Sequence, residues 1–197
     1  RQFLCVPIEQ WADTEGGDNF VGRDIDRFPG GDHNKYKTNC RSCHSVMDGN
    51  RGAWARFDFA EGIIKNAFVP ISGSGYSPMS LDGSVSSKMN ENSNTFPGGF
   101  KVTNDRFVNT AVRGKNADYF GWESPLKGYG VGEFGAMISK SKAFPYCMAR
   151  RAFRSVCKRE PKGFDEETLQ RVSQAFVDSG FKLRTLMEYT AISKNCV

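Results

Sequence analysis

The sequence has only two histidines, His33 and His44, and one Cys-x-x-Cys pair, formed by Cys40 and Cys43. A structural zinc site takes four ligands at paired spacings, so this small supply of ligands disfavours such a site. No run of apolar residues approaches the roughly eighteen that a membrane-spanning helix needs. We therefore expect neither a structural zinc ion nor a membrane span.

The chain also lacks a methionine and an apolar signal region at its start, since it begins at Arg1. This pattern predicts a mature, processed form. The formal net charge of +5 is modest and spread over 197 residues, which disfavours nucleic-acid binding and leaves a mild preference for acidic partners. A chain of this length is sufficient for a sizeable domain with a buried core.

Six cysteines are typical of an oxidising compartment and predict a secreted protein, either periplasmic or extracellular. The four outside the Cys-x-x-Cys pair are Cys5, Cys147, Cys157 and Cys196. Cys147 and Cys157 belong to one predicted helix and are separated along it by about 15 Å, so they cannot bond each other. We expect each to form a disulfide with Cys5, with Cys196 or with another chain; free buried thiols are the alternative.

The first two thirds of the chain predict little regular structure, because most of the 21 glycines lie there. Residues 1–32 show no sustained helical or strand period, and we expect an irregular N-terminal arm that precedes a single domain at 33–197. Residues 70–100 are rich in Ser, Gly, Asn and Pro and predict a long loop.

One short helix is predicted in the middle of the chain. Asn104 or Asp105 can cap a helix that runs through Val112, and Gly114 is well placed as its C-terminal stop.

The last third has clear helical periodicity. Apolar residues at helical spacing predict a helix at 144–158, a second between Asp165 as N-cap and Gly180 as stop, and a third at 182–192. Short connections make these helices antiparallel neighbours. We therefore expect a C-terminal three-helix module within about 131–197.

Residues Gly130 to Gly135 match the dinucleotide-binding pattern G-x-G-x-x-G. No hydrophobic strand is predicted before them, and the βαβ context that gives the pattern its mechanism is missing. We do not expect nicotinamide or flavin binding from this match.

Cys40, Cys43 and His44 form a Cys-x-x-Cys-His motif, which covalent attachment of a c-type haem requires. Each thiol can form a thioether with one haem vinyl group, and the histidine is then placed as the proximal iron ligand. A thiol redox couple is the weaker alternative, because the residues before Cys40 are polar and loop-like and do not predict a βαβ unit. The motif predicts one covalent haem c.

The second axial ligand has several candidates. His33 is the only other histidine, and the chain between it and His44 is long enough to pass around the edge of a porphyrin. Met79 lies in the predicted loop downstream of the motif, as distal methionines do in class I c-type cytochromes; Met89 and Met137 are further candidates. An open site is the third alternative. We expect His33 as the distal ligand, with Met79 as the alternative.

Several other side chains are candidates for contact with the haem. The apolar set expected to form a wall of its pocket, or ordinary core, comprises Ala53, Trp54, Phe57, Ile63, Ile64 and Phe68. Further aromatics that would lie against the ring are Tyr119 and Trp122. Basic residues on the first C-terminal helix are Arg150, Arg151, Arg154, Lys158 and Arg159. We expect these cations to form a solvated helix face; pairing with haem propionates or an acidic redox partner is the alternative.

Two stretches together resemble a family of secreted bacterial monohaem c-type cytochrome-like proteins whose domains have no assigned function. The motif followed by Met47-Asp48 and Phe57-Asp58 is similar to the family's haem-binding segment. The run Phe144 to Phe153 is similar to the start of its C-terminal helical module. The resemblance covers about half of the chain and implies a haem-binding domain in which a histidine before the first cysteine, here His33, serves the iron.

The sequence thus predicts a mainly α, loop-rich c-type cytochrome-like domain that transfers single electrons through its haem and is not an enzyme. Its partner would be a redox protein or a neighbouring cytochrome. The alternative is a structural, polymer-forming extracellular cytochrome, in which Cys5 and Cys196 join subunits into a homo-oligomer or filament that conducts electrons. A haem peroxidase is a third hypothesis, but two histidines provide few acid or base groups.

Overall fold

The computed structural model describes residues 3–7, 10, 20, 38, 40–60, 63–66, 85, 89 and 100–196. The chain divides into two compact units. Unit 1 comprises Arg1–Pro7, Gly114–Glu123 and Met137–Val197, and unit 2 comprises Ile8–Arg113 and Ser124–Ala136. Most of the predicted arm at 1–32 and of the predicted loop at 70–100 lies outside the described residues, and the predicted single domain at 33–197 stays a prediction.

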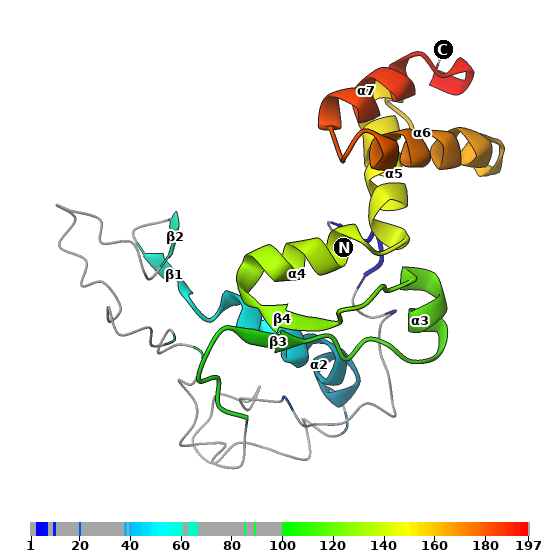
Figure 1. Ribbon diagram of the computed structural model, residues 1–197. Helices are drawn as coiled ribbons and strands as arrows, with labels where there is room; N and C mark the ends of the chain where they lie inside the picture. The colour runs from blue at the N-terminus through cyan, green and yellow to red at the C-terminus, as the bar shows by residue number, and fades with distance from the viewer. Residues whose placement is uncertain are drawn as a thin grey trace, which may run out of the picture. The chain divides into compact units, whose positions relative to one another are not determined.

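Unit 1 is helical, and its described elements confirm the mainly α class (Figure 1). It contains α3 (Gly114–Phe120), the end of α4 (Gly130–Ser139), α5 (Ala143–Cys157), α6 (Glu166–Asp178), α7 (Leu183–Ala191) and the short 3₁₀ helices η5 (Gly163–Asp165) and η6 (Lys194–Cys196). Helices α5, α6 and α7 confirm the three predicted C-terminal helices to within two residues at each end.

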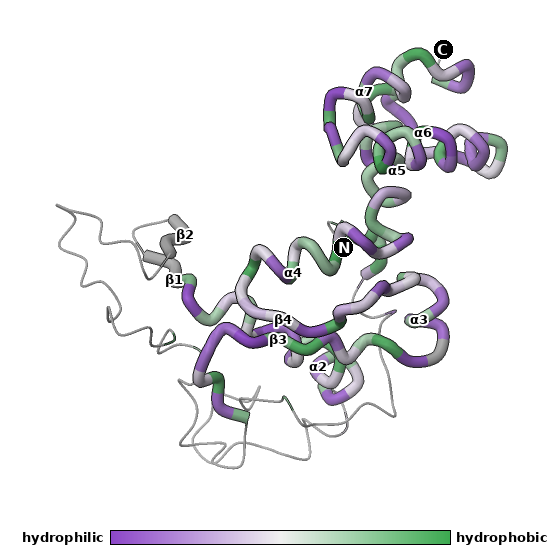
Figure 2. Tube along the Cα trace, in the orientation of Figure 1, coloured by the Kyte–Doolittle hydropathy of each residue, from purple (hydrophilic) through white to green (hydrophobic). Residues whose placement is uncertain are grey.

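Helices α5, α6 and α7 share one apolar core. Figure 2 shows hydrophobic and hydrophilic residues alternating along these helices, as an amphipathic period requires. The buried residues of this core are Ala149, Ala152, Phe153, Leu169, Val172, Phe176 and Leu186. Each helix contributes at least one of them, so the module is stabilised mainly by burial of these faces.

Contacts at the two ends of α5 show how the three helices run. After α6, the ring of Phe181 lies 5.8 Å from that of Phe144 at the start of α5 and 5.3 Å from that of Phe176. After α7, Cys196 forms a disulfide with Cys157 at the end of α5. Successive helices therefore reverse direction, as predicted from their short connections.

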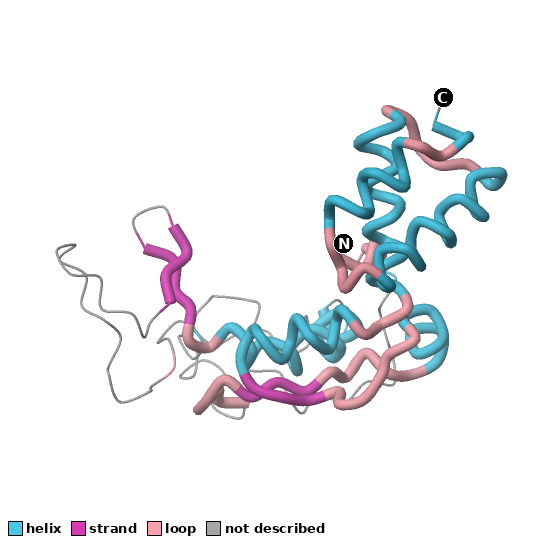
Figure 3. Tube along the Cα trace, turned by 45° about the horizontal axis from the view of Figure 1, so that its top comes forward, coloured by secondary structure: helices cyan, strands magenta, loops and turns pink. Residues whose placement is uncertain are grey.

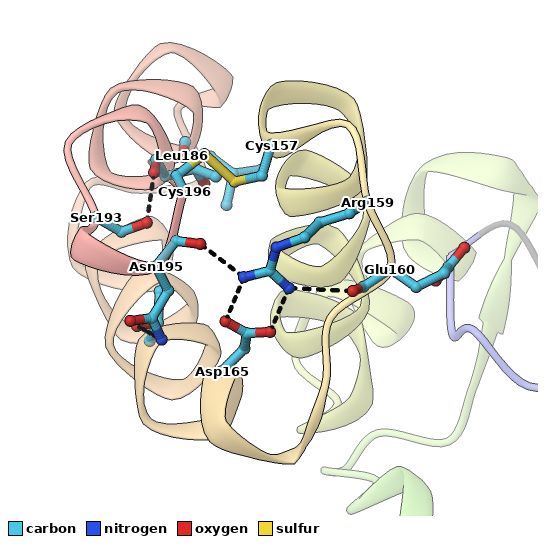
Figure 4. Close-up of a disulfide and its surroundings, with 10 residues drawn as sticks. Cys157, Arg159, Glu160, Asp165, Leu186, Ser193, Asn195 and Cys196 are labelled. Atoms are coloured by element: carbon cyan, nitrogen blue, oxygen red, sulfur yellow. Dashed lines mark hydrogen bonds and ion pairs between the residues drawn. A yellow bond between two sulfur atoms is a disulfide. The ribbon is translucent and has the colours of Figure 1, made fainter.

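Arg159 joins the end of α5 to the start of α6 and to the C-terminal segment (Figure 4). Its Nη1 and Nη2 donate to Asp165 Oδ2 and Oδ1 at 2.6 and 2.9 Å, and Nη2 also donates to the Asn195 carbonyl oxygen at 2.6 Å. The guanidinium carbon lies 4.7 Å from the ring centre of Phe153. The expectation that all five cations of this region form a solvated face is wrong for Arg159, because a buried carboxylate holds it.

Asp165 occupies the predicted N-cap position of α6, but its side chain makes no capping hydrogen bond to that helix. Its carboxylate is fully buried and instead accepts from Arg159 and, at 2.8 Å, from the backbone N–H of Lys162. The hydrogen bond from Arg159 is the main cause that lowers the pKa of Asp165 to about 2, against the effect of burial. The aspartate thus ties together the ends of two helices.

The second disulfide joins Cys5 to Cys147 and fastens the start of the chain to α5. Leu4 and Val6 beside it are buried. The prediction that Cys147 and Cys157 do not bond each other is confirmed. The alternative in which Cys5 and Cys196 join subunits loses this linkage, because both cysteines bond within the chain; a homo-oligomer or filament stays a prediction.

Unit 2 contains α2 (Arg41–Met47), the 3₁₀ helix η3 (Asp48–Trp54), two antiparallel strand pairs and the start of α4. The two strand pairs are separate sheets, drawn in magenta in Figure 3. Strand β1 (Phe57–Ala60) pairs with β2 (Ile63–Asn66), and β3 (Arg106–Val108) pairs with β4 (Lys127–Tyr129). Helix α2 runs directly into η3, so the predicted motif lies on a continuous helical segment.

The predicted helix from Asn104 or Asp105 to Val112 is wrong, because this stretch contains strand β3. The side chain of Asn104 accepts a hydrogen bond from the backbone N–H of Arg106 at 2.9 Å, which forms a local turn in place of a helix cap. Phe107 is buried between two less buried neighbours, as the period of a strand requires. Gly114, predicted to end a helix, begins α3.

A short strand does precede the G-x-G-x-x-G match at Gly130–Gly135, since β4 ends at Tyr129 and α4 begins at Gly130. Its residues are Lys-Gly-Tyr, so it is not the hydrophobic strand that the dinucleotide pattern requires. That strand is antiparallel to β3, and the described strands form no parallel βαβ unit. Glu133 Oε2 accepts the backbone N–H of Tyr129 at 2.8 Å, so the chain's own carboxylate occupies the start of the helix. This arrangement does not suit a dinucleotide phosphate.

The Asp165 carboxylate makes the stability of unit 1 depend on pH. Its folded pKa of about 2 lies below the ordinary value of 3.8, so its contribution is fully present above about pH 4 and is lost as pH falls toward 2. We expect Asp165→Asn to be less stable than wild type at pH 7, with the difference shrinking toward pH 2. Chemical unfolding followed by circular dichroism between pH 2 and 7 measures this difference.

The matched control is Asp178→Asn, which removes an exposed carboxylate on α6 that accepts a hydrogen bond from Gln174. We expect its profile to follow that of wild type. A constant difference between Asp165→Asn and wild type over the whole pH range would contradict the role assigned to the carboxylate charge.

Candidate haem-attachment site

The three residues of the predicted motif lie along the start of α2. Cys40 is the N-cap of this helix, and Cys43 and His44 lie within its first turns. Positions separated by three and four residues share one face of a helix, so the spacing directs all three side chains to the same side. The three residues are partly exposed, which leaves them accessible to a cofactor.

The two disulfides of unit 1 use the four cysteines outside the motif. Four of the six cysteines are bonded in pairs, and the two that are not are Cys40 and Cys43. Thioether formation needs reduced thiols at these positions. The separation of bonded and unbonded cysteines therefore fits the use of the motif for covalent attachment of haem.

His44 has a carboxylate behind its ring. Its Nδ1 lies 2.9 Å from Asp48 Oδ1, one helical turn further along the chain. A carboxylate only accepts hydrogen bonds, so the contact places the ring hydrogen on Nδ1 and assigns Nε2 as the nitrogen that would face an iron atom. This is the usual arrangement behind a histidine that binds a metal.

Close backbone packing holds the segment that carries Asp48. A Cβ added at Gly49 would collide with the Val108 carbonyl oxygen of β3, and one added at Gly52 would collide with the Arg106 carbonyl oxygen. Thr110 Oγ1 also donates to the Ser45 carbonyl oxygen at 2.8 Å. These contacts fasten α2 and η3 to the β3 segment, so the motif stands on a packed support.

A small cavity of about 230 Å³ lies beside this support. Its wall includes Asp48, Gly49, Gly52, Lys101 and Arg106. Pockets for small organic ligands are usually at least about 300 Å³. The cavity is therefore too small to be a further cofactor site, and it does not include the motif cysteines.

The structure describes two of the four candidates for the distal iron ligand, Met89 and Met137. His33 and Met79 both lie outside the described residues. Met89 is 9% exposed and packs in an apolar cluster with Ala55 and Val102, which is the role of a core side chain. Met137 is buried in the part of α4 that belongs to unit 1. His33 and Met79 stay predictions.

The aromatics predicted to line the haem pocket fall into different parts of the structure. Trp54 is 48% exposed, and its ring centre lies 6.4 Å from that of Phe57 and 6.0 Å from that of Phe134. Tyr119 and Trp122 belong to unit 1, whereas the motif belongs to unit 2. The side chains of Ile63, Ile64 and Phe68 lie outside the described ones.

The sequence analysis did not identify the pair of aromatic rings beside Trp54, which Phe107 and Phe134 form. Phe107 is buried, and its ring centre lies 5.4 Å from that of Phe134 in edge-to-face contact. The strand period around Phe107 is the signal that identifies it. The short length of the strand, three residues, is why a helix was predicted there instead.

Within the described part of the chain, no group of three or more His, Cys, Asp or Glu side chains is placed to hold a metal ion. A haem needs only one or two protein ligands for its iron, which the motif can provide. The same residues include no helix long and apolar enough to span a membrane.

Comparison with models of protein families, with curated proteins and with solved structures gives no match. The resemblance to secreted cytochrome-like proteins therefore stays a prediction.

The packing of η3 against β3 gives a mutational test. We expect Gly52→Ala to destabilise the protein by about 1–3 kcal/mol, because the methyl group meets backbone that cannot move aside easily. The control is Gly132→Ala in α4, where a Cβ meets nothing within 4 Å. That change should be neutral or stabilise by up to about 1 kcal/mol. Urea unfolding of both variants measures the effect, and equal stability of the two would rule out the close approach.

Proposed function

We propose that this protein transfers single electrons through one haem c attached at Cys40 and Cys43. The observation that carries the proposal is the state of the motif. Its two thiols stand apart from the disulfides, and His44 is held by Asp48 so that Nε2 is the ligating nitrogen. A zinc site would need further ligands beside these three residues.

Each residue of the motif has a distinct role in the proposal. The two cysteines hold the porphyrin through thioethers, which keeps the cofactor bound in both oxidation states. His44 supplies the proximal imidazole, and His33, or Met79 as the alternative, supplies the distal ligand. The haem, when bound, supplies the Fe(III)/Fe(II) couple; the protein sets the potential and determines which edge meets a partner.

The proposed setting is the periplasm or the exterior of the cell. Two disulfides suit an oxidising compartment. A net charge of +5 favours an acidic redox protein or a neighbouring cytochrome as the partner. Among the basic residues of α5, Arg154 forms an exposed ion pair with Glu160 at 2.7 Å, which contributes little to stability and leaves the guanidinium accessible.

The haem itself is the first test. The protein is produced in bacteria that attach haem to c-type cytochromes, and its oxidised and reduced spectra are recorded. We expect one haem per chain that stays bound after denaturation. Cys40→Ala and Cys43→Ala should each leave one thioether, and the double variant should leave none. Ser42→Ala, between the two cysteines, is the control and should keep full attachment. Absence of haem from wild type would disprove the proposal.

The distal ligand is tested with the same material. We expect His33→Ala to convert the ferric spectrum from low spin to high spin, because the iron loses its sixth ligand. Met79→Ala is the matched variant and should leave the spectrum low spin. The opposite result, together with the long-wavelength absorption band of methionine ligation in wild type, would assign Met79 in place of His33.

A further inference from the structure

The contact between Asp48 and His44 places a negative charge beside the imidazole, in addition to orienting the ring. The acceptor is a full carboxylate, and the Asp48 side chain is only 12% exposed. An anion that is largely removed from water is poorly screened, so its charge acts on the imidazole with more effect than a surface group would have.

Two arginines close to Asp48 in the sequence are bonded to other groups, and Lys101 and Arg106 share the wall of a cavity with Asp48 without a hydrogen bond to it among the described contacts. Arg56 Nε donates to Asp105 Oδ2 at 2.8 Å, and Arg51 Nη2 donates to the Phe100 carbonyl oxygen at 3.0 Å. The contact that the described structure gives the Asp48 carboxylate is the one with His44. The charge of Asp48 is thus directed at the ring that would bind iron.

The contact is also built into the backbone. Asp48 follows His44 by one helical turn, and the Asp48 backbone N–H donates to the His44 carbonyl oxygen. Gly49, the next residue, is held against β3. The aspartate is therefore in place before any cofactor is attached, and no rearrangement is needed to bring it to the ring.

We propose that Asp48 is a positioning residue that sets the reduction potential of the haem through His44. A carboxylate that accepts from Nδ1–H raises the basicity of the imidazole, and a more basic imidazole favours Fe(III) over Fe(II). The haem, held by Cys40, Cys43 and His44, would supply the Fe(III)/Fe(II) couple and would take its electron from a reduced redox protein; no bond would form or break, and Asp48 would keep the proton on Nδ1 of His44. This inference rests on the proposed function, since it requires the haem.

The test is a series of variants at position 48. Asp48→Asn keeps the shape and an acceptor oxygen but removes the charge, and Asp48→Ala removes both. We expect the Fe(III)/Fe(II) ratio at a fixed ambient potential to fall about tenfold in Asp48→Asn, equivalent to a rise of about 59 mV for one electron. Asp48→Ala should show a shift at least as large. Potentiometric titration followed by the haem spectrum measures both.

Asp105→Asn is the matched control, because it removes a second partly buried carboxylate of unit 2 that pairs with Arg56 and not with His44. It should leave the ratio within about twofold of wild type, a limit set by the weak effect of a more distant charge. A change of the Fe(III)/Fe(II) ratio in Asp105→Asn as large as that in Asp48→Asn would overturn the proposal. Loss of any nearby negative charge would then be enough to shift the reduction potential, without a contact to His44.

Nitrogen-15 resonances of the two imidazoles in the haem-free full chain give a readout that does not need the cofactor. His44 should be the Nδ1–H tautomer in wild type and a mixture in Asp48→Ala. Full haem attachment in Asp48→Asn with an unchanged potential would overturn the role of Asp48 and leave the proposed function standing. Absence of haem from wild type and all variants would overturn both, while a normal spectrum with the tautomer change and the shifted potential supports both.

Discussion

Strand β3 crosses η3 so closely that positions 49 and 52 have no room for a side chain, and the support of α2 and of the predicted motif depends on this approach. Two glycines three residues apart on a 3₁₀ helix lie on one side of it, so both can face the same strand. The contact holds α2 by its C-terminal end and places Asp48 where it is largely removed from water. A residue with a side chain at either position would displace the support beneath the predicted haem ligand.

Unit 1 is stabilised in a different way. Its apolar core is formed by the facing sides of α5, α6 and α7, and the chain ends are then fastened by two disulfides and by the Arg159–Asp165 pair. Disulfides act largely by restricting the unfolded chain, whereas the ion pair acts in the folded state, where it satisfies a carboxylate with no exposure to water. The C-terminal segment is therefore held from two directions, by Cys196 and by the Asn195 carbonyl oxygen.

The contrast between the two units explains which predictions were confirmed. In unit 1 the period of apolar residues extends over whole helices, and Asp165 and Gly180 mark their ends, so local pattern and packing agree. In unit 2 the regular elements are short. Strand β3 has three residues, and Asn104 before it suits a helix cap as well as a turn. With so few residues the spacing of apolar side chains cannot distinguish a strand from a helix. Pairing with β4, which is distant in sequence, made this segment a strand.

The sequence by itself determined which residues form the candidate site, because Cys40, Cys43 and His44 are neighbours on the chain and their spacing does not depend on the fold. It also determined the C-terminal helices, and it excluded a bond between Cys147 and Cys157. Only the tertiary structure decided the pairing of the four cysteines, the partner of Arg159 and the partly buried position of Asp48. Each of these depends on which segments distant in sequence come into contact. The packing of whole helix and strand faces determines those contacts, and a local sequence pattern does not report it.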